Sequence, residues 1–82
     1  MKAQFFTYFK LTQEKQSEQF ADELKKLNYE VERSILDYAG GQWSVIINTE
    51  VKDEDNLMVV EDKIAGLTEK FGGEYDGNEV EI

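Results

Sequence analysis

The sequence has 82 residues with neither cysteine nor histidine, and its 18 acidic side chains against nine basic ones give a net charge of −9. This length predicts a single domain with one small core, and the lack of cysteine excludes disulfide frameworks and thiolate metal sites, which favours a reducing, cytoplasmic setting. The usual general base, metal ligands and reactive nucleophile are also missing, so the composition predicts a non-catalytic protein without cofactor or metal.

The acidic side chains are scattered along the whole chain. Their field repels phosphate backbones and anionic lipid, because nucleic-acid affinity comes mostly from Lys and Arg. The charge therefore disfavours direct binding of nucleic acid, and it serves either solubility or a basic partner. No apolar stretch has the length of a signal-peptide core or of a membrane span, so we expect neither export nor membrane insertion.

The first half of the chain reads as strand, helix and strand. Residues 3–10 are rich in aromatic and β-branched side chains, which is typical of a strand. A helix is predicted to begin at the N-cap Thr12 and to run to about Leu27, with Asn28 closing it. Residues 29–36 then alternate with period two, and Arg33 interrupts their apolar face, which indicates an edge strand.

The second half repeats this order. After the predicted turn at Asp37–Gly41, residues 42–49 form a strand whose apolar run on both faces indicates a central position. Asp53 is expected to cap a second helix, whose apolar positions run with helical period to Phe71. The acidic run that begins at Asp53 is similar to the opening of a calcium loop, but the later positions lack its Gly and Glu, which favours helix capping. A last extended segment covers residues 74–82.

The predicted order of strand, helix, strand, strand, helix, strand indicates an α+β domain of the ferredoxin-like class over residues 1–82. In this βαββαβ fold two helices cover one face of a four-stranded antiparallel sheet. The two periodicities place one set of side chains in the core: Phe5, Phe9, Phe20, Leu24, Leu27, Val31, Val45, Ile47, Leu57, Val60, Ile64, Leu67 and Phe71.

The uncovered face of the sheet is the first candidate for a binding site. If Phe5 and Phe9 point toward the helices, the pleat sends Phe6 and Tyr8 outward, beside Ile46 of the neighbouring central strand. An exposed apolar patch usually marks an interface, and self-association through this face is one expectation. The alternative is that half-exposed aromatic residues are simply good strand formers.

Four stretches carry a family resemblance: residues 5–12, 27–31, 43–45 and, most specifically, the run Phe71-Gly72-Gly73-Glu74-Tyr75-Asp76-Gly77. Together they resemble the ribonuclease E inhibitor B family, small acidic proteins also called regulators of ribonuclease activity B. The resemblance implies a ferredoxin-like fold, no catalysis, and inhibition of an RNA-degrading endonuclease by protein binding. Family members that act on ribonuclease E also carry acidic extensions at both ends that these residues do not include, and Asn78 stands where an aromatic residue often follows Asp-Gly.

We therefore expect a regulator of RNA turnover whose partner is a protein, such as a ribonuclease or an RNA-processing factor. The expected anchoring surface joins the sheet residues to the specific run and consists of Phe6, Tyr8, Ile46, Glu74, Tyr75, Asp76 and Gly77. A structural alternative makes Asp76-Gly77 a bulge in the last strand, with Tyr75 packing over its neighbours. Two other functions stay open, namely an RNA-recognition module that stacks bases on Phe6 and Tyr8, and a domain that binds a small ligand.

Overall fold

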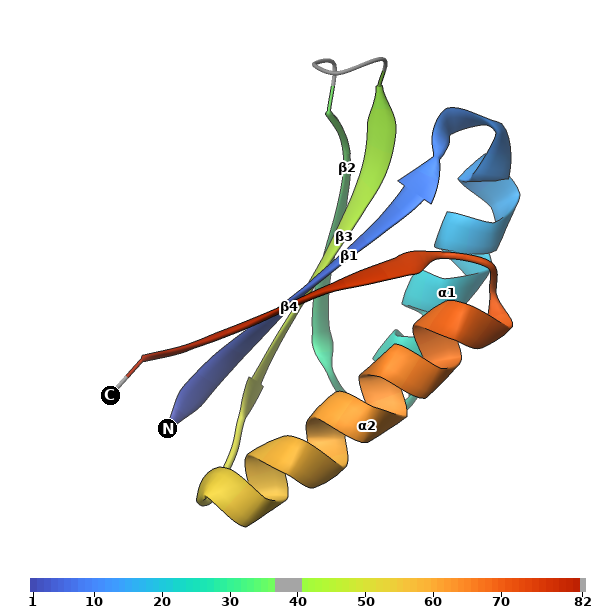
Figure 1. The fold of residues 1–82 in the computed structure, drawn as a ribbon. Helices are drawn as coiled ribbons and strands as arrows, with labels where there is room; N and C mark the ends of the chain where they lie inside the picture. Colours follow the sequence, from blue (N-terminus) through green and yellow to red (C-terminus); the bar gives the residue numbers. More distant parts are fainter. Residues whose placement is uncertain (37–40, 82) are drawn as a thin grey trace.

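The structure, a computed structural model, describes residues 1–36 and 41–81 (Figure 1). The order of its elements confirms the predicted one, with a short 3-10 turn at Leu11–Gln13 before the first helix. The predicted turn residues 37–40 and the final residue of the last predicted strand lie outside the described residues. The elements are β1 (Lys2–Lys10), α1 (Glu14–Lys26), β2 (Glu30–Leu36), β3 (Gln42–Glu50), α2 (Glu54–Lys70) and β4 (Glu74–Glu81).

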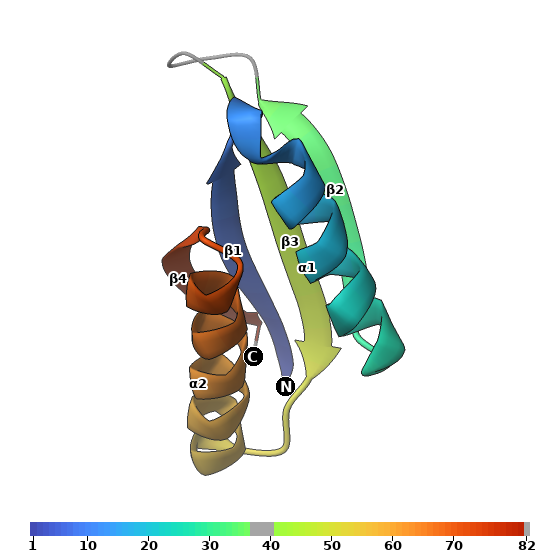
Figure 2. The same ribbon diagram turned by 90° about the vertical axis from the view of Figure 1, so that its right-hand side faces the viewer.

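The four strands form one antiparallel sheet in the order β2-β3-β1-β4. The helices α1 and α2 lie side by side on one face of this sheet, as Figure 2 shows, and the other face carries no element of the described chain. This arrangement confirms the predicted α+β, ferredoxin-like class, the central place of β3 and the edge position of β2. No helix in the described residues is long and apolar enough to span a bilayer.

The core lies between the sheet and the two helices. Most predicted core residues are buried there, and Val31, Leu57, Val60, Leu67 and Phe71 are partly buried against them. The prediction for Leu27 is wrong, because α1 ends at Lys26 and Leu27 has left the helical conformation, so that its side chain is 40% exposed. The buried apolar residues are Ala3, Phe5, Phe9, Phe20, Ala21, Leu24, Val45, Ile47, Val51 and Ile64.

The helix ends are fixed by local hydrogen bonds. The prediction of Thr12 as N-cap is wrong, because Thr12 lies inside the 3-10 turn, where Gln13 Oε1 accepts from the backbone N–H of Lys10 at 2.9 Å. At the other end of α1, Asn28 has a φ of 69°, and its N–H donates to the carbonyl of Lys25, which confirms the predicted stop. Asp53 Oδ1 accepts from the N–H of Asn56 at 2.8 Å, so the predicted cap of α2 is confirmed.

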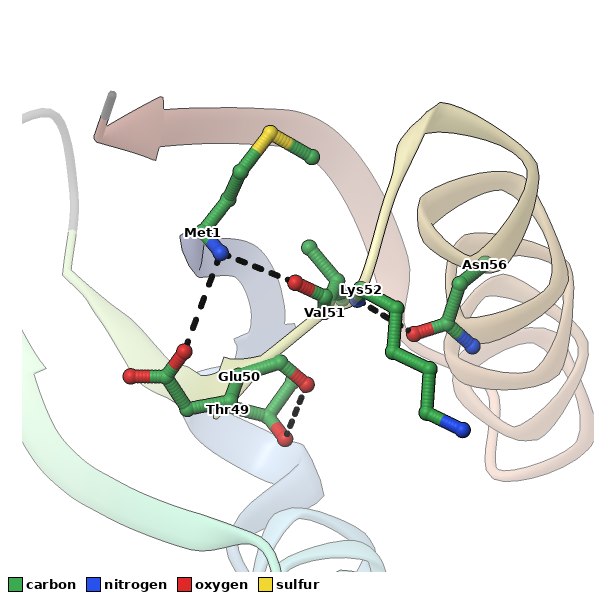
Figure 3. Close-up of polar contacts among 6 residues, drawn as sticks. All are labelled: Met1, Thr49, Glu50, Val51, Lys52 and Asn56. Carbon is green, nitrogen blue, oxygen red and sulfur yellow. Dashed lines mark hydrogen bonds and ion pairs between the residues drawn. The ribbon is translucent and has the colours of Figure 1, made fainter.

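The start of β1 is tied to the segment that follows β3 (Figure 3). The amino group of Met1 donates to the carbonyl of Val51 at 2.9 Å, and the N–H of Val51 donates back to the carbonyl of Met1 at 2.8 Å. The N–H of Lys52 donates to Asn56 Oδ1 at 2.9 Å, in the first turn of α2. The first two bonds hold one end of the two central strands together, and the third joins the following segment to α2.

Gly66 gives a stability prediction, because nothing in the fold requires a glycine there. It is exposed in the interior of α2, and a Cβ built on it meets no atom within 4 Å. Alanine should stabilise the protein by about 0.5–1 kcal/mol, since it restricts the unfolded chain and favours the helix. The matched control is Gly73→Ala, whose Cβ would lie 2.6 Å from the ring of Phe9. This variant should destabilise the protein. Urea melts of both variants check the two opposite signs.

Candidate functional site

The uncovered face of the sheet carries a strip of three apolar side chains. Alternate residues of β1 (Phe5, Thr7 and Phe9) are buried toward the helices, so that Phe6 and Tyr8 belong to the other face, where both are half-buried. Ile46 of β3 lies directly opposite Phe6 and is half-buried as well. We call Phe6, Tyr8 and Ile46 the apolar strip. The structure thus brings together the three sheet residues that the sequence singled out.

Glutamates flank this strip on both outer strands. By strand register, Glu30 and Glu32 of β2 lie on the same face as the strip, with Glu32 opposite Ile46. On the other side, Glu74 of β4 lies opposite Tyr8, while Glu79 and Glu81 lie opposite Gln4 and Lys2. We call these two rows the acidic rails: Glu30 and Glu32 on one side, and Glu74, Glu79 and Glu81 on the other.

The rails meet a hollow at the end of the sheet where β1 begins. This hollow has a volume of about 600 Å³ and is lined by four glutamates, with Lys2 and a pair of amides between them. In the pair, Gln4 Nε2 donates to Asn48 Oδ1 at 3.1 Å. With the fourth lining glutamate, Glu50, the uncovered face carries six glutamates against two lysines in the described residues. No group of acidic side chains in the described chain is placed to hold a metal ion.

Arg33 does not offset this charge, because it belongs to the opposite face. Arg33 of β2 is half-buried on the side of the helices, where its guanidinium lies 4.3 Å from the ring centre of Trp43. Its Nη1 also donates to Ser17 Oγ of α1 at 3.2 Å. The guanidinium of Arg33 therefore has its partners on the side of the helices. The uncovered face stays strongly acidic.

A bulge in β4 separates the residues of the specific sequence run. The pairing of β4 with β1 shifts opposite Phe6, where Asp76 and Gly77 lie and where Gly77 has a φ of +104°, which favours glycine. Because of this shift, Tyr75 and Asn78 both fall on the side of the helices. The hydroxyl of Tyr75 donates to Glu61 Oε2 of α2 at 2.7 Å, and Asn78 Nδ2 donates to the same oxygen.

The expected anchoring surface is thus divided between two layers of the molecule. Glu74 shares the uncovered face with the apolar strip, and the bulge at Asp76 and Gly77 lies beside Phe6. Tyr75 lies in the other layer, half-buried and packed against the core. This placement supports the structural alternative, in which Asp76-Gly77 is a bulge and Tyr75 packs over its neighbours. The hydroxyl of Tyr75 in addition joins β4 to α2.

Tyr75 gives a prediction for alkaline pH. Its partial burial, and then its hydrogen bond to Glu61, raise the pKa of Tyr75 to about 12. Because the folded state favours the neutral phenol, this contribution to stability is fully present below the ordinary tyrosine pKa of about 10 and is lost as the pH rises toward 12. Absorbance titration near 295 nm should show one late-titrating tyrosine that disappears in Tyr75→Phe. A Tyr75→Phe profile identical to that of the parent would contradict the prediction.

Apart from Glu74, the residues of the rails and of the hollow were missed by sequence reasoning. The signal was present in part, because Glu30 and Glu32, like Glu79 and Glu81, alternate with period two within their strands. The sequence alone does not give the pairing partners of these strands. Only the observed register places both pairs on the same face as Phe6.

One family model matches almost the whole chain. It is described as RraB, regulator of ribonuclease activity B, and it covers residues 3–80, which include both helices and nearly all of the four strands. No curated protein matches the chain.

Proposed function

Since the chain belongs to the RraB family, the regulators of ribonuclease activity B, we propose that its uncovered sheet face is the surface that binds the nuclease. The family resemblance expected from the sequence is thereby confirmed. Members of this family are non-catalytic regulators of ribonuclease E.

One observation carries the proposal: an apolar strip lies between two rows of glutamates on the only broad face of the sheet that the described chain leaves uncovered. Protein interfaces commonly combine an apolar centre with a charged rim. A nuclease needs basic surfaces to hold RNA, so an acidic face is complementary to such a surface and competes with RNA for it. Because regulators of this family act on cytoplasmic ribonuclease E, we expect both proteins in the cytoplasm.

The same charges disfavour two other occupants of this face, namely a second copy of the chain and RNA. In a symmetric dimer through the strip, the rails of one copy would face the rails of the other, and like charges across an interface oppose association. Bases of RNA could stack on Phe6 and Tyr8, but the flanking glutamates repel the phosphates that connect them. A basic protein partner can cover the apolar strip and pair its positive charges with the glutamates of the rails.

The test compares inhibition of ribonuclease E by the parent and by a double variant, Phe6→Ser with Tyr8→Ser. Cleavage of a fluorescent RNA should slow in the presence of the parent and proceed nearly unhindered with the double variant. The matched control changes two exposed apolar residues of α2, Met58→Ser with Val59→Ser, which are 62% and 65% exposed, and should inhibit like the parent. Equal inhibition by the folded double variant would contradict the proposed surface.

Light scattering of the parent alone separates the remaining occupants. A monomer at high protein concentration is the expected result, because the rails repel each other. A stable dimer that the double variant abolishes would show that a second copy covers the strip. A gel shift with RNA that weakens steeply with salt would favour the RNA-binding alternative instead.

A further inference from the structure

We infer that the part of the nuclease that occupies this face is a basic amphipathic α-helix, lying lengthwise between the acidic rails. The inference rests on the proposed function, because it names the kind of segment that the uncovered face receives. It follows from the width of the face, from the hydrogen bonding of an occupant, and from the order of chemical groups along the strands.

The spacing of the rails fits one helix. The rails lie on the two outer strands β2 and β4, which are separated by the two central strands. Three strand spacings of about 4.8 Å place the rails roughly 14 Å apart, and an α-helix with its side chains is about 10–12 Å wide. A helix on the apolar strip therefore brings the side chains on its two flanks next to the glutamates of both rails.

Backbone hydrogen bonding favours a helix over an extended segment on this face. The N–H and C=O groups of a sheet point toward neighbouring strands, so the face offers few backbone partners to a chain that lies on it. An extended segment buried there would leave its own backbone groups unsatisfied, whereas a helix pairs them internally. A helix on this side also completes a third layer, with helices on both faces of the sheet.

The order of charged and apolar side chains along the sheet indicates which side chains the partner helix carries at each of its ends. From Gln4, at the hollow, to Tyr8 the strand advances by about 13 Å, which corresponds to roughly nine residues of α-helix. The hollow end offers the four glutamates that line it, whereas the other end offers the apolar strip with one glutamate on each flank, Glu32 and Glu74. The helix should thus carry an apolar stripe with a 3.6-residue period and lysines or arginines on both flanks, most of them at the end over the hollow.

A cross-linking experiment tests this with the intact nuclease. The chain has no cysteine, so Gln4→Cys gives a unique attachment point for a photo-activated cross-linker on the floor of the site. Asp62→Cys, on an exposed position of α2, is the matched control. Mass spectrometry of the complex with ribonuclease E should find cross-links from Gln4→Cys in one segment with net positive charge and helical apolar period, and few from Asp62→Cys.

A synthetic peptide with the cross-linked sequence then tests the conformation and the rails. On binding the chain, the peptide should gain helical ellipticity at 222 nm. Glu30→Gln with Glu79→Gln, one change on each rail, should weaken peptide binding roughly 2- to 30-fold at low salt and flatten its salt dependence. The control pair Glu18→Gln with Glu69→Gln, exposed on the two helices, should leave the affinity unchanged.

The outcomes separate this inference from the proposed function. Cross-links from Gln4→Cys to an acidic or non-periodic segment, a bound peptide without helical gain, or an unchanged affinity of the rail variant would overturn the helix and leave the face as the binding surface. Cross-links from Asp62→Cys alone, in a complex that still inhibits the nuclease, would overturn the proposed surface as well.

Discussion

Replacement of Ile64 by alanine is expected to lower the free energy of unfolding by about 2–5 kcal/mol. Ile64 is fully buried in α2, at the centre of the core between the sheet and the helices. The loss combines the transfer of the removed methyl and methylene groups with the cavity that rigid neighbours leave behind. In a domain of this size such a loss is a large fraction of the total stability.

The control for this prediction lies on the same helix. Val59 is 65% exposed, so that Val59→Ala should change the free energy of unfolding by no more than about 0.5 kcal/mol. Denaturant melts followed by circular dichroism measure both variants under identical conditions. A loss below about half a kilocalorie for Ile64→Ala would mean that α2 packs with another face toward the sheet.

The strongly periodic elements were predictable because their patterns are local. The apolar residues of α2 recur with a helical period, and the alternation of β1 is marked by Lys10, whose charge is best placed on the uncovered face. Leu27 shows the limit of the same reasoning, because it continues the apolar period of α1 one residue beyond the end of the helix. The side chain of Leu27 is exposed because the chain turns at Asn28. The apolar period alone does not predict the position of that turn.

Residues whose place depends on pairing between distant strands were harder to predict. Tyr75 falls on the side of α2 because a bulge at Asp76 and Gly77 shifts the alternation of β4, and a simple period of two does not include that shift. The acidic rails require the register of all four strands at once. Their members are ordinary exposed glutamates in the sequence, and only the folded sheet arranges them around Phe6.

The kinetics of binding should divide between the strip and the rails. Phe6→Ser should raise the rate of dissociation from ribonuclease E about 30-fold, since removal of a packed aromatic anchor costs about 2 kcal/mol or more. Glu79→Gln, on a rail, should instead lower the association rate and weaken its dependence on salt, because exposed charges act over a Debye length of about 8 Å at physiological ionic strength. Stopped-flow binding at two salt concentrations measures both effects.

Substitutions of Tyr75 test whether the specific run at residues 71–77 takes part in binding the partner through this side chain. Its hydroxyl bonds Glu61 in the layer of the helices, so Tyr75→Phe keeps the ring in place and removes only this donor. Tyr75→Ala removes the ring as well, and circular dichroism shows whether that variant is still folded. An unchanged dissociation rate in both variants would mean that Tyr75 supports the fold and that the anchor lies elsewhere. A dissociation rate raised as far as in Phe6→Ser, in a folded Tyr75→Ala, would instead extend the binding surface around the edge of β4, because truncation of a packed anchor acts mainly on the dissociation rate.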